Sequence, residues 1–173
     1  VIDVPYLLRA LLVRGVILRK RPEDSAHAYK KIWMDEGSPL IVLSERMHKK
    51  VQPLTDVPVA LAMRYGSMTV EKGLQELHDQ GVTDVMLLPL YPQYAMASTL
   101  TIEVLAEKIR KKKFPNMKMM NFPAFYNKPD FIKVLSNSIK ENLESYDYDQ
   151  LVFSYHGIPE RHIRKTDVTK SHC

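Results

Sequence analysis

The sequence predicts an α/β fold: a parallel, doubly wound sheet of Rossmann-type topology with flanking helices. Two observations lead to this expectation. From residue 57 onward, short apolar runs alternate with stretches of helical periodicity, as in strand–helix–strand units with right-handed crossovers. The runs are also almost continuously apolar, which is typical of strands that are buried on both faces.

Three helices are expected before the first strand. Residues 2–18 place apolar side chains at helical spacing, with Arg9 and Arg14 toward the other side, and Pro5 lies in the first turn. The run Arg19-Lys-Arg-Pro22 is expected to end this amphipathic helix.

A second helix is then expected to start at Asp24 or Ser25, either of which can cap it, and to end at Gly37. A third is expected from Pro39 to about Val51. An ordinary nucleotide-type α/β domain opens with a strand, so this start predicts that an N-terminal piece is missing.

The later strands and helices are predicted from the spacing of apolar residues and from the capping and breaking residues between them. The expected strands are residues 57–63, 84–90, 117–122 and 150–155, and the expected helices are residues 70–80, 100–112 and 131–143. Thr69 is placed to cap the first of these helices and Gly81 to close it. We see no internal repeat and no low-complexity segment.

Composition narrows the class of protein. The chain has 173 residues, of which 45% are hydrophobic and 26% charged, too apolar for disorder and too interrupted for a membrane span. A single cysteine fits a reducing compartment, so we expect a cytoplasmic protein. The chain begins at Val1 and ends at Cys173 after a polar tail, which suggests a piece of something longer.

The net charge of +5 favours acidic ligands or an anionic membrane surface over basic partners. We expect no nucleic-acid partner, because the main basic cluster, residues 110–113, falls at a predicted helix end, where the helix dipole favours cations. Glycine-rich phosphate-binding motifs and the Gly-x-Ser-x-Gly elbow of serine hydrolases do not occur.

Three predicted strand ends carry polar side chains. Arg64 and Tyr65 follow the first strand, Tyr91 and Ser98 lie in the loop after the second, and His156 ends the fourth. Each has an ordinary interpretation: a surface arginine, packed tyrosines, a helix cap and a hydrogen-bonded histidine. Because ligands collect outside the carboxyl ends of parallel strands, the group together predicts a cleft for a flat, apolar, carboxylate-bearing ligand and a metal ion.

Two further metal interpretations are weaker. Glu160 lies four residues after His156, but Gly157 and Pro159 make one helical face for both improbable. The terminal Ser-His-Cys173 resembles half of a metal site, although one cysteine beside one histidine is little evidence.

The chain resembles the ferrochelatases, which insert ferrous iron into protoporphyrin as the last step of haem synthesis. The resemblance covers essentially the whole chain and rests on these segments: residues 1–5, 25–32 with 36–40, 63–65, 88–94 with 97–99, and 153–160. The form Tyr-His-Gly-Ile-Pro-Glu-Arg161 looks bacterial.

This resemblance implies a chelatase fold of two similar domains that hold a porphyrin between them. Residues 1–148 would be the first domain, without its opening strand, and residues 149–173 the start of a truncated second domain. The fragment alone is expected to be inactive and poorly stable, because missing parts leave apolar surface exposed.

The resemblance also implies roles for particular residues. His156 matches the family's active-site histidine, assigned as iron ligand or as acceptor of pyrrole protons; the sequence leaves both roles open. Arg64 and Tyr65 match a pair that lines the porphyrin pocket, and Arg21 an arginine near its mouth. Tyr91 and Ser98 match the loop that faces the propionates.

The implied partners are porphyrin and ferrous iron, with iron as a substrate and no required prosthetic group. An iron–sulfur cluster near Cys173 has only weak support, and the N-terminal amphipathic helix suggests peripheral membrane contact. The alternatives are a cobalt chelatase of the same fold and a non-catalytic tetrapyrrole- or metal-binding module. Protoporphyrin and coproporphyrin are not distinguished, nor is the oligomeric state predicted.

Overall fold

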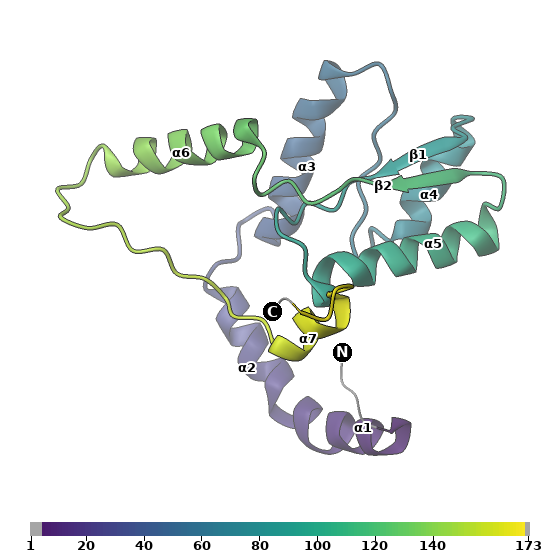
Figure 1. Cartoon of the computed structure of the whole chain (residues 1–173), viewed down its shortest axis with the longest axis horizontal. Coiled ribbons are helices and arrows are strands. Elements are labelled where there is room, and N and C mark those ends of the chain that lie inside the picture. The colour runs from purple at the N-terminus through teal and green to yellow at the C-terminus, as the bar shows by residue number, and fades with distance from the viewer. Residues whose placement is uncertain (1–4, 172–173) are drawn as a thin grey trace. The chain divides into compact units, whose positions relative to one another are not determined.

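The structure is a computed structural model that describes residues 5–171, without the side chains of residues 9, 16 and 20. The chain forms two compact units, Val1–Gly81 and Val82–Cys173. Figure 1 shows helices through both units and the strands in the second. No helix within the described residues combines the length and apolar character that crossing a bilayer requires.

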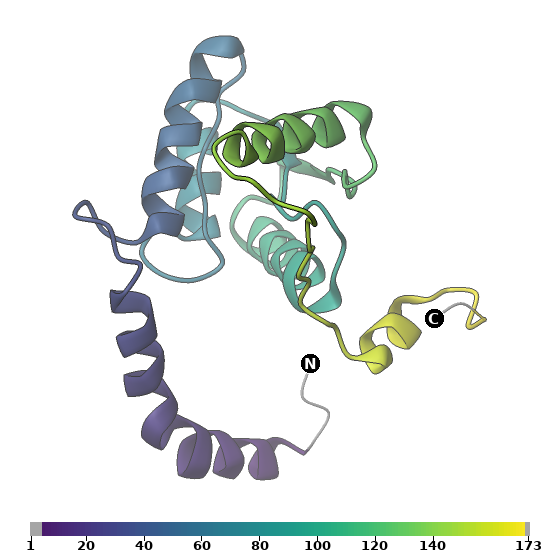
Figure 2. The ribbon, with the colours of Figure 1, turned by 90° about the vertical axis from the view of Figure 1, so that its left-hand side faces the viewer.

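The first unit begins with helical turns that run on without a break. Helix α1 (Tyr6–Leu12) passes through a π-helical turn, η1 (Val13–Ile17), into α2 (Leu18–Lys30). The predicted break at residues 19–22 was wrong, because Pro22 lies inside α2. A proline ring crowds the carbonyl four residues earlier, and a bent helix accommodates it; Figure 2 shows this ribbon as a continuous curve.

The other helices of this unit follow the sequence pattern closely. Helix α3 (Pro39–Val51) has the predicted bounds, continues into a 3₁₀ turn, η2 (Gln52–Leu54), and precedes α4 (Val70–Asp79). Thr69 caps α4 as predicted, since its Oγ1 accepts a hydrogen bond of 3.2 Å from the Lys72 N–H. Gly81 follows α4 with a φ of +78°, a conformation that suits glycine at a helix end.

Residues 57–63 do not form the predicted strand; only Met63 makes an isolated bridge, to Thr69. The backbone of this segment bonds to side chains instead of to a neighbouring strand. Gln52 Oε1 accepts from the Val59 N–H at 2.9 Å, and His48 Nε2 donates to the Val59 carbonyl at 2.6 Å. The segment also packs tightly on α4, where a Cβ on Gly73 would lie 3.2 Å from the Ala62 Cβ.

The second unit is built on two parallel strands. Strand β1 (Asp84–Leu87) pairs with β2 (Lys118–Asn121), from Asp84 beside Lys118 to Leu87 beside Asn121. The connection runs through a π-helical turn, η3 (Met96–Leu100), and helix α5 (Thr101–Lys113), which packs against β2. This parallel crossover with a covering helix confirms the predicted α/β class.

The core of the second unit lies between α5 and the sheet. Its buried apolar side chains are Ile102, Ala106, Phe114 and Met117. Ala106 is completely buried, so the helix approaches closely at that point. Arg110 Nη1 donates to the Met117 carbonyl at 2.6 Å and ties the end of α5 to the start of β2.

Helices α6 (Pro129–Leu143) and α7 (Glu160–Thr166) complete the unit. Between them lies what we call the open segment, residues 144–159, which contains no regular strand, so the predicted strand at residues 150–155 was wrong. An apolar run becomes a strand only when a neighbouring strand takes up its backbone groups, and no described segment pairs with this one.

Candidate functional site

Arg64 and Tyr65 are brought together in the first unit. The Arg64 Cζ lies 4.8 Å from the centre of the Tyr65 ring, a cation–π contact. Arg64 Nε is buried and has no hydrogen-bond partner, whereas the Tyr65 ring is 79% exposed. A donor held without a partner beside an open aromatic face is suited to a flat anionic ligand.

Arg21 also belongs to the first unit, where it lies on α2 and is exposed. No contact within residues 5–171 fixes its guanidinium toward a pocket, so Arg21 remains a candidate on sequence grounds alone.

Tyr91 lies next to a pair of backbone hydrogen bonds that join the chain segments following the two strands of the second unit. The carbonyl of Pro92 accepts bonds of 3.0 Å from the N–H groups of Phe125 and Tyr126. These residues follow β1 and β2, so the two strand exits are joined at their carboxyl ends. Tyr91 stands next to this junction and is 41% exposed, accessible to a ligand.

Ser98 lies in η3, directly after the same loop. Its Oγ donates a long bond of 3.5 Å to the Ala95 carbonyl, which also accepts from the Ser98 N–H at 3.2 Å. Thr99, only 5% exposed, carries the stronger local role, because its Oγ1 accepts a bond from the Ala95 N–H. Since Thr99 is buried and Ser98 is only partly buried, the Ser98 hydroxyl is the more accessible of the two to a ligand.

A tyrosine and a carboxylate in this region both have raised pKa values. Partial burial, and then the charge of Glu103, raise the pKa of Tyr94, and partial burial raises the pKa of Glu103 itself. Sequence reasoning named Tyr94 only as part of the loop and did not foresee Glu103. The carboxylate adds a hydrogen-bonding group to the face of α5 near the loop.

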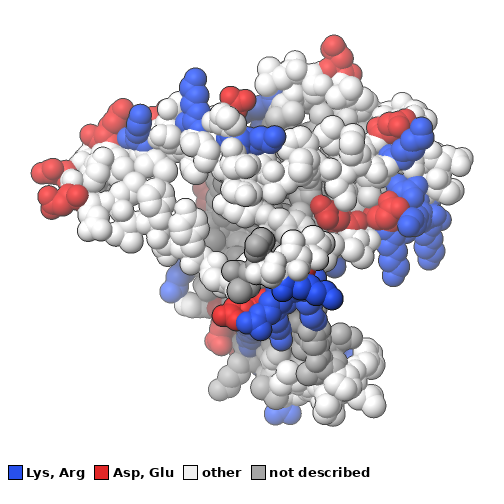
Figure 3. All heavy atoms as spheres, viewed as in Figure 1, with Lys and Arg blue, Asp and Glu red and all other residues white. Residues whose placement is uncertain are grey.

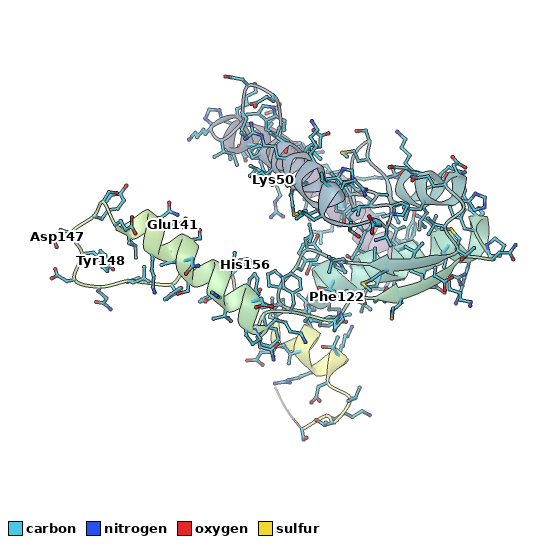
Figure 4. All side chains as sticks on the ribbon, turned by 90° about the horizontal axis from the view of Figure 1, so that it is seen from above. Lys50, Phe122, Glu141, Asp147, Tyr148 and His156 are labelled. Atoms are coloured by element: carbon cyan, nitrogen blue, oxygen red, sulfur yellow. The ribbon has the colours of Figure 1, made fainter. Side chains whose placement is uncertain are left out.

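His156 lies in the open segment and is exposed. Figure 4 shows Asp147 and Tyr148 at the turn where the chain leaves α6, away from His156. The neighbouring Phe153 and Tyr155 rings stack in parallel, with centroids 6.4 Å apart, so the segment is extended at this point. The exposed imidazole of His156 is thus accessible to a substrate.

The described residues hold no group of three or more histidine, cysteine, aspartate or glutamate side chains that could bind a metal ion. His156 therefore belongs to no such group within residues 5–171. His172 and Cys173 lie outside the described residues, so the interpretation of the Ser-His-Cys end as part of a metal or iron–sulfur site is not addressed by the structure.

Basic side chains collect at the end of α5, as Figure 3 shows. Arg110 holds Glu107 with two bonds, of 2.7 and 2.9 Å, and Lys111 is 3.4 Å from the same carboxylate. The Arg110 hydrogen bond is the main reason that the pKa of Glu107 falls to about 2. A shallow depression on this face is lined by Glu103, Glu107 and three lysines, and it contains none of the predicted site residues.

One polar residue that sequence reasoning passed over stands out. His162 of α7 is only 6% exposed, and its Nε2 is buried without a hydrogen-bond partner. Its sequence context, Arg161-His-Ile-Arg164, is that of a charged surface helix, so no sequence signal separated it from its exposed neighbours.

The fold and these loops define a class: an α/β protein with parallel strands, in which Tyr91 and Ser98 follow the carboxyl end of β1. Arg64, Tyr65 and His156 lie in irregular segments, since the strands predicted before them do not form. The family model described as ferrochelatase matches residues 1–173. The chain belongs to the ferrochelatase family.

Individual relatives agree with this assignment. The chain is 45% identical over 174 residues to a ferrochelatase of Stutzerimonas stutzeri and 45% identical to one of Pseudomonas syringae pv. tomato. It is 43% identical to a ferrochelatase of Azotobacter vinelandii. Each alignment covers all of this chain and 50 or 51% of the relative, so the chain spans about half the length of the curated relatives it matches.

Proposed function

We propose that the full-length protein inserts ferrous iron into protoporphyrin IX to give protohaem, the last step of haem biosynthesis. The observation that carries this proposal is the match of the ferrochelatase family to the whole of residues 1–173. Porphyrin and ferrous iron are then the two substrates, and the reaction is that of a lyase-type metal chelatase.

Arg64 and Tyr65 are proposed to bind the porphyrin. A porphyrin has a flat apolar face and carboxylates at its edge. The exposed Tyr65 ring offers a stacking surface, and the Arg64 guanidinium beside it offers a cation for a carboxylate. Arg21 is proposed to serve the same substrate as a cation near the pocket mouth.

Tyr91 and Ser98 are proposed to contact the propionates. Their loop is fixed at the strand exits by the Pro92 carbonyl, while the Ser98 hydroxyl keeps only a 3.5 Å bond. A rigid loop with a loosely held hydroxyl can bind a carboxylate without first breaking a strong bond.

His156 is proposed to be the catalytic residue. Metal insertion removes two pyrrole protons from the porphyrin and places its nitrogens around the ion. An imidazole can accept such a proton or donate a nitrogen to Fe²⁺, and the exposure of His156 leaves it accessible for either role.

We further propose the domain division implied by the resemblance, with residues 1–148 in the first chelatase domain and residues 149–173 opening the second. A cytoplasmic location is proposed as well.

Peripheral membrane contact is proposed through α1, where Tyr6, Leu7 and Leu11 are 69 to 75% exposed and Arg14 follows in η1. Binding of the full-length protein to anionic vesicles, reduced by Leu7→Gln with Leu11→Gln, would test this contact.

The activity is tested with the purified full-length protein, protoporphyrin and Fe²⁺ under anaerobic conditions. We expect the porphyrin fluorescence to disappear as haem absorption grows, and we expect Arg64→Ala to raise the porphyrin KM about tenfold, as loss of a charge-assisted bond would. Lys50→Ala, an exposed basic change, is the control. Absence of haem formation by the wild-type protein would contradict the proposal.

Two rivals give different results in the same assay. A cobalt chelatase would prefer Co²⁺ and a precorrin-type ring in a competition of metals and tetrapyrroles. A non-catalytic binding module would bind porphyrin without metal insertion, and His156→Ala would leave that binding unchanged.

A further inference from the structure

His162 is the buried residue of a region that is otherwise open. Among the described residues 144–171 it is the only buried one, and every residue of the open segment is exposed. Within the described residues, this segment is therefore held by the elements at its two ends, α6 and α7.

At its C-terminal end the open segment runs into α7, and α7 lies against η3. His162 is the buried residue of α7, and α7 is the element that contacts η3. The backbone around it is well tied: the His162 N–H bonds to the Pro159 carbonyl at 2.8 Å, and Thr166 Oγ1 donates to the His162 carbonyl at 3.0 Å.

The element on the other side of this contact carries Ser98, which follows the loop of Tyr91. The contact of α7 with η3 therefore joins the segment of His156 to the segment of Ser98 within one unit. Only five residues separate His156 from His162, so the position of α7 limits where His156 can lie.

We propose that His162 is a positioning residue that anchors α7 on η3 and thereby holds His156 at a fixed place relative to the propionate-contacting loop. The anchor acts by filling space, because Nε2 has no partner. This inference rests on the proposed function, in which His156 performs the proton or metal step and Ser98 contacts the substrate.

If His162 acts by filling space, substitutions at this position should depend on side-chain size and not on polarity. A buried nitrogen without a partner is a cost, so an apolar side chain of similar length should anchor α7 as well as histidine does or better. A methyl group should not, because it leaves a void between α7 and η3.

The experiment measures zinc insertion into protoporphyrin by the full-length protein and its His162→Ala, His162→Leu and Arg164→Gln variants. For His162→Ala we expect kcat to fall about tenfold, with the porphyrin KM within about twofold of wild type, because misplacement of a reacting group affects the chemical step. His162→Leu and the exposed control Arg164→Gln should stay within about twofold of wild type in both parameters.

Other outcomes would overturn the anchor. An unchanged kcat in His162→Ala would show that the buried imidazole does not position His156. Equal losses in His162→Ala and His162→Leu, with recovery in a fourth variant, His162→Gln, would assign the role to a polar contact of the side chain in the full-length protein and not to packing. If His162→Ala does not fold, the Leu and Gln variants decide between the two.

Failure of the inference differs from failure of the proposed function. In the first case the wild-type protein inserts zinc and only the pattern among the variants disagrees. In the second, the wild-type protein shows no metal insertion at all.

Discussion

Two neighbouring regions of the second unit contain similar apolar sequences and have different structures. In what we call the paired module, residues 84–121, both predicted strands form and α5 covers them. The open segment, residues 144–159, contains the equally β-prone Leu151-Val-Phe-Ser-Tyr155, yet forms no strand, and Val152 is 77% exposed.

The difference lies in where each backbone finds its partners. Strands β1 and β2 bond to each other, and flanking bonds extend the ladder, as from the Phe122 N–H to the Leu87 carbonyl at 2.8 Å. Residues 150–155 have no such neighbour among the described residues. Apolar character therefore predicts a tendency to form a strand, whereas pairing decides whether the strand forms.

The regions also divide the work that we propose. The paired module supplies stability and fixes Tyr91 and Ser98, while the open segment supplies the accessible histidine. Substitutions in each region of the full-length protein should separate these two contributions.

The largest effect is expected from His156→Ala. Loss of a proton acceptor or metal ligand should lower kcat for iron insertion by roughly 100-fold or more, while the free energy of unfolding stays within about 0.5 kcal/mol of wild type. Steady-state haem formation and urea unfolding measure the two quantities. Unfolding at much lower urea would mean that the histidine is structural.

The next largest effect is expected on the free energy of unfolding, in a comparison of one buried and one exposed side-chain truncation. Ile102→Ala should lower the free energy of unfolding by about 2–4 kcal/mol, because Ile102 is buried and the side chain leaves a cavity. Val152→Ala, in the open segment, should cost at most about 0.5 kcal/mol. Equal costs in urea unfolding would show that the open segment is buried in the full-length protein.

A smaller effect is expected for the hydroxyl that supports η3. Thr99→Val keeps the shape but removes the acceptor for the Ala95 N–H, and should cost about 1 kcal/mol of unfolding free energy. Ser154→Ala, an exposed hydroxyl in the open segment, is the control and should be neutral. Chemical denaturation measures the unfolding free energy of both variants. A Thr99→Val variant as stable as the wild-type protein would contradict the prediction.

The smallest effect concerns the charge pair on the surface of α5. Arg110 lowers the pKa of Glu107 from 4.5 to about 2, so the ionised carboxylate stabilises the folded state above the unfolded pKa. This contribution should decline as the pH falls from 4.5 toward 2, and Glu107→Gln should remove that part of the pH dependence. Carboxyl titration by NMR checks the direction, and a Glu107 pKa at or above 4.5 would contradict it.

Much of the fold was predictable because its signals are local. The bounds of α3, the Thr69 cap and the termination of α4 at Gly81 follow from residues within a few positions of each helix end. The break expected at Pro22 did not follow, because a curved helix accommodates a proline that a straight one would not.

The candidate site was predicted only as a set of residues. Arg64, Tyr65, Tyr91, Ser98 and His156 were found because polar groups follow apolar runs, and this sequence pattern also underlies the family resemblance. His162 was missed because its burial depends on the contact of α7 with η3, which no periodicity in a seven-residue helix reveals.

The sequence by itself determined the α/β class, most helix ends and the family to which the chain belongs, because these depend on local propensities and on ordered motifs. Tertiary structure alone decided which apolar runs became strands, since hydrogen bonds between distant segments complete a strand. It also decided that one histidine is exposed and another buried, because burial depends on what packs against a side chain and not on its identity.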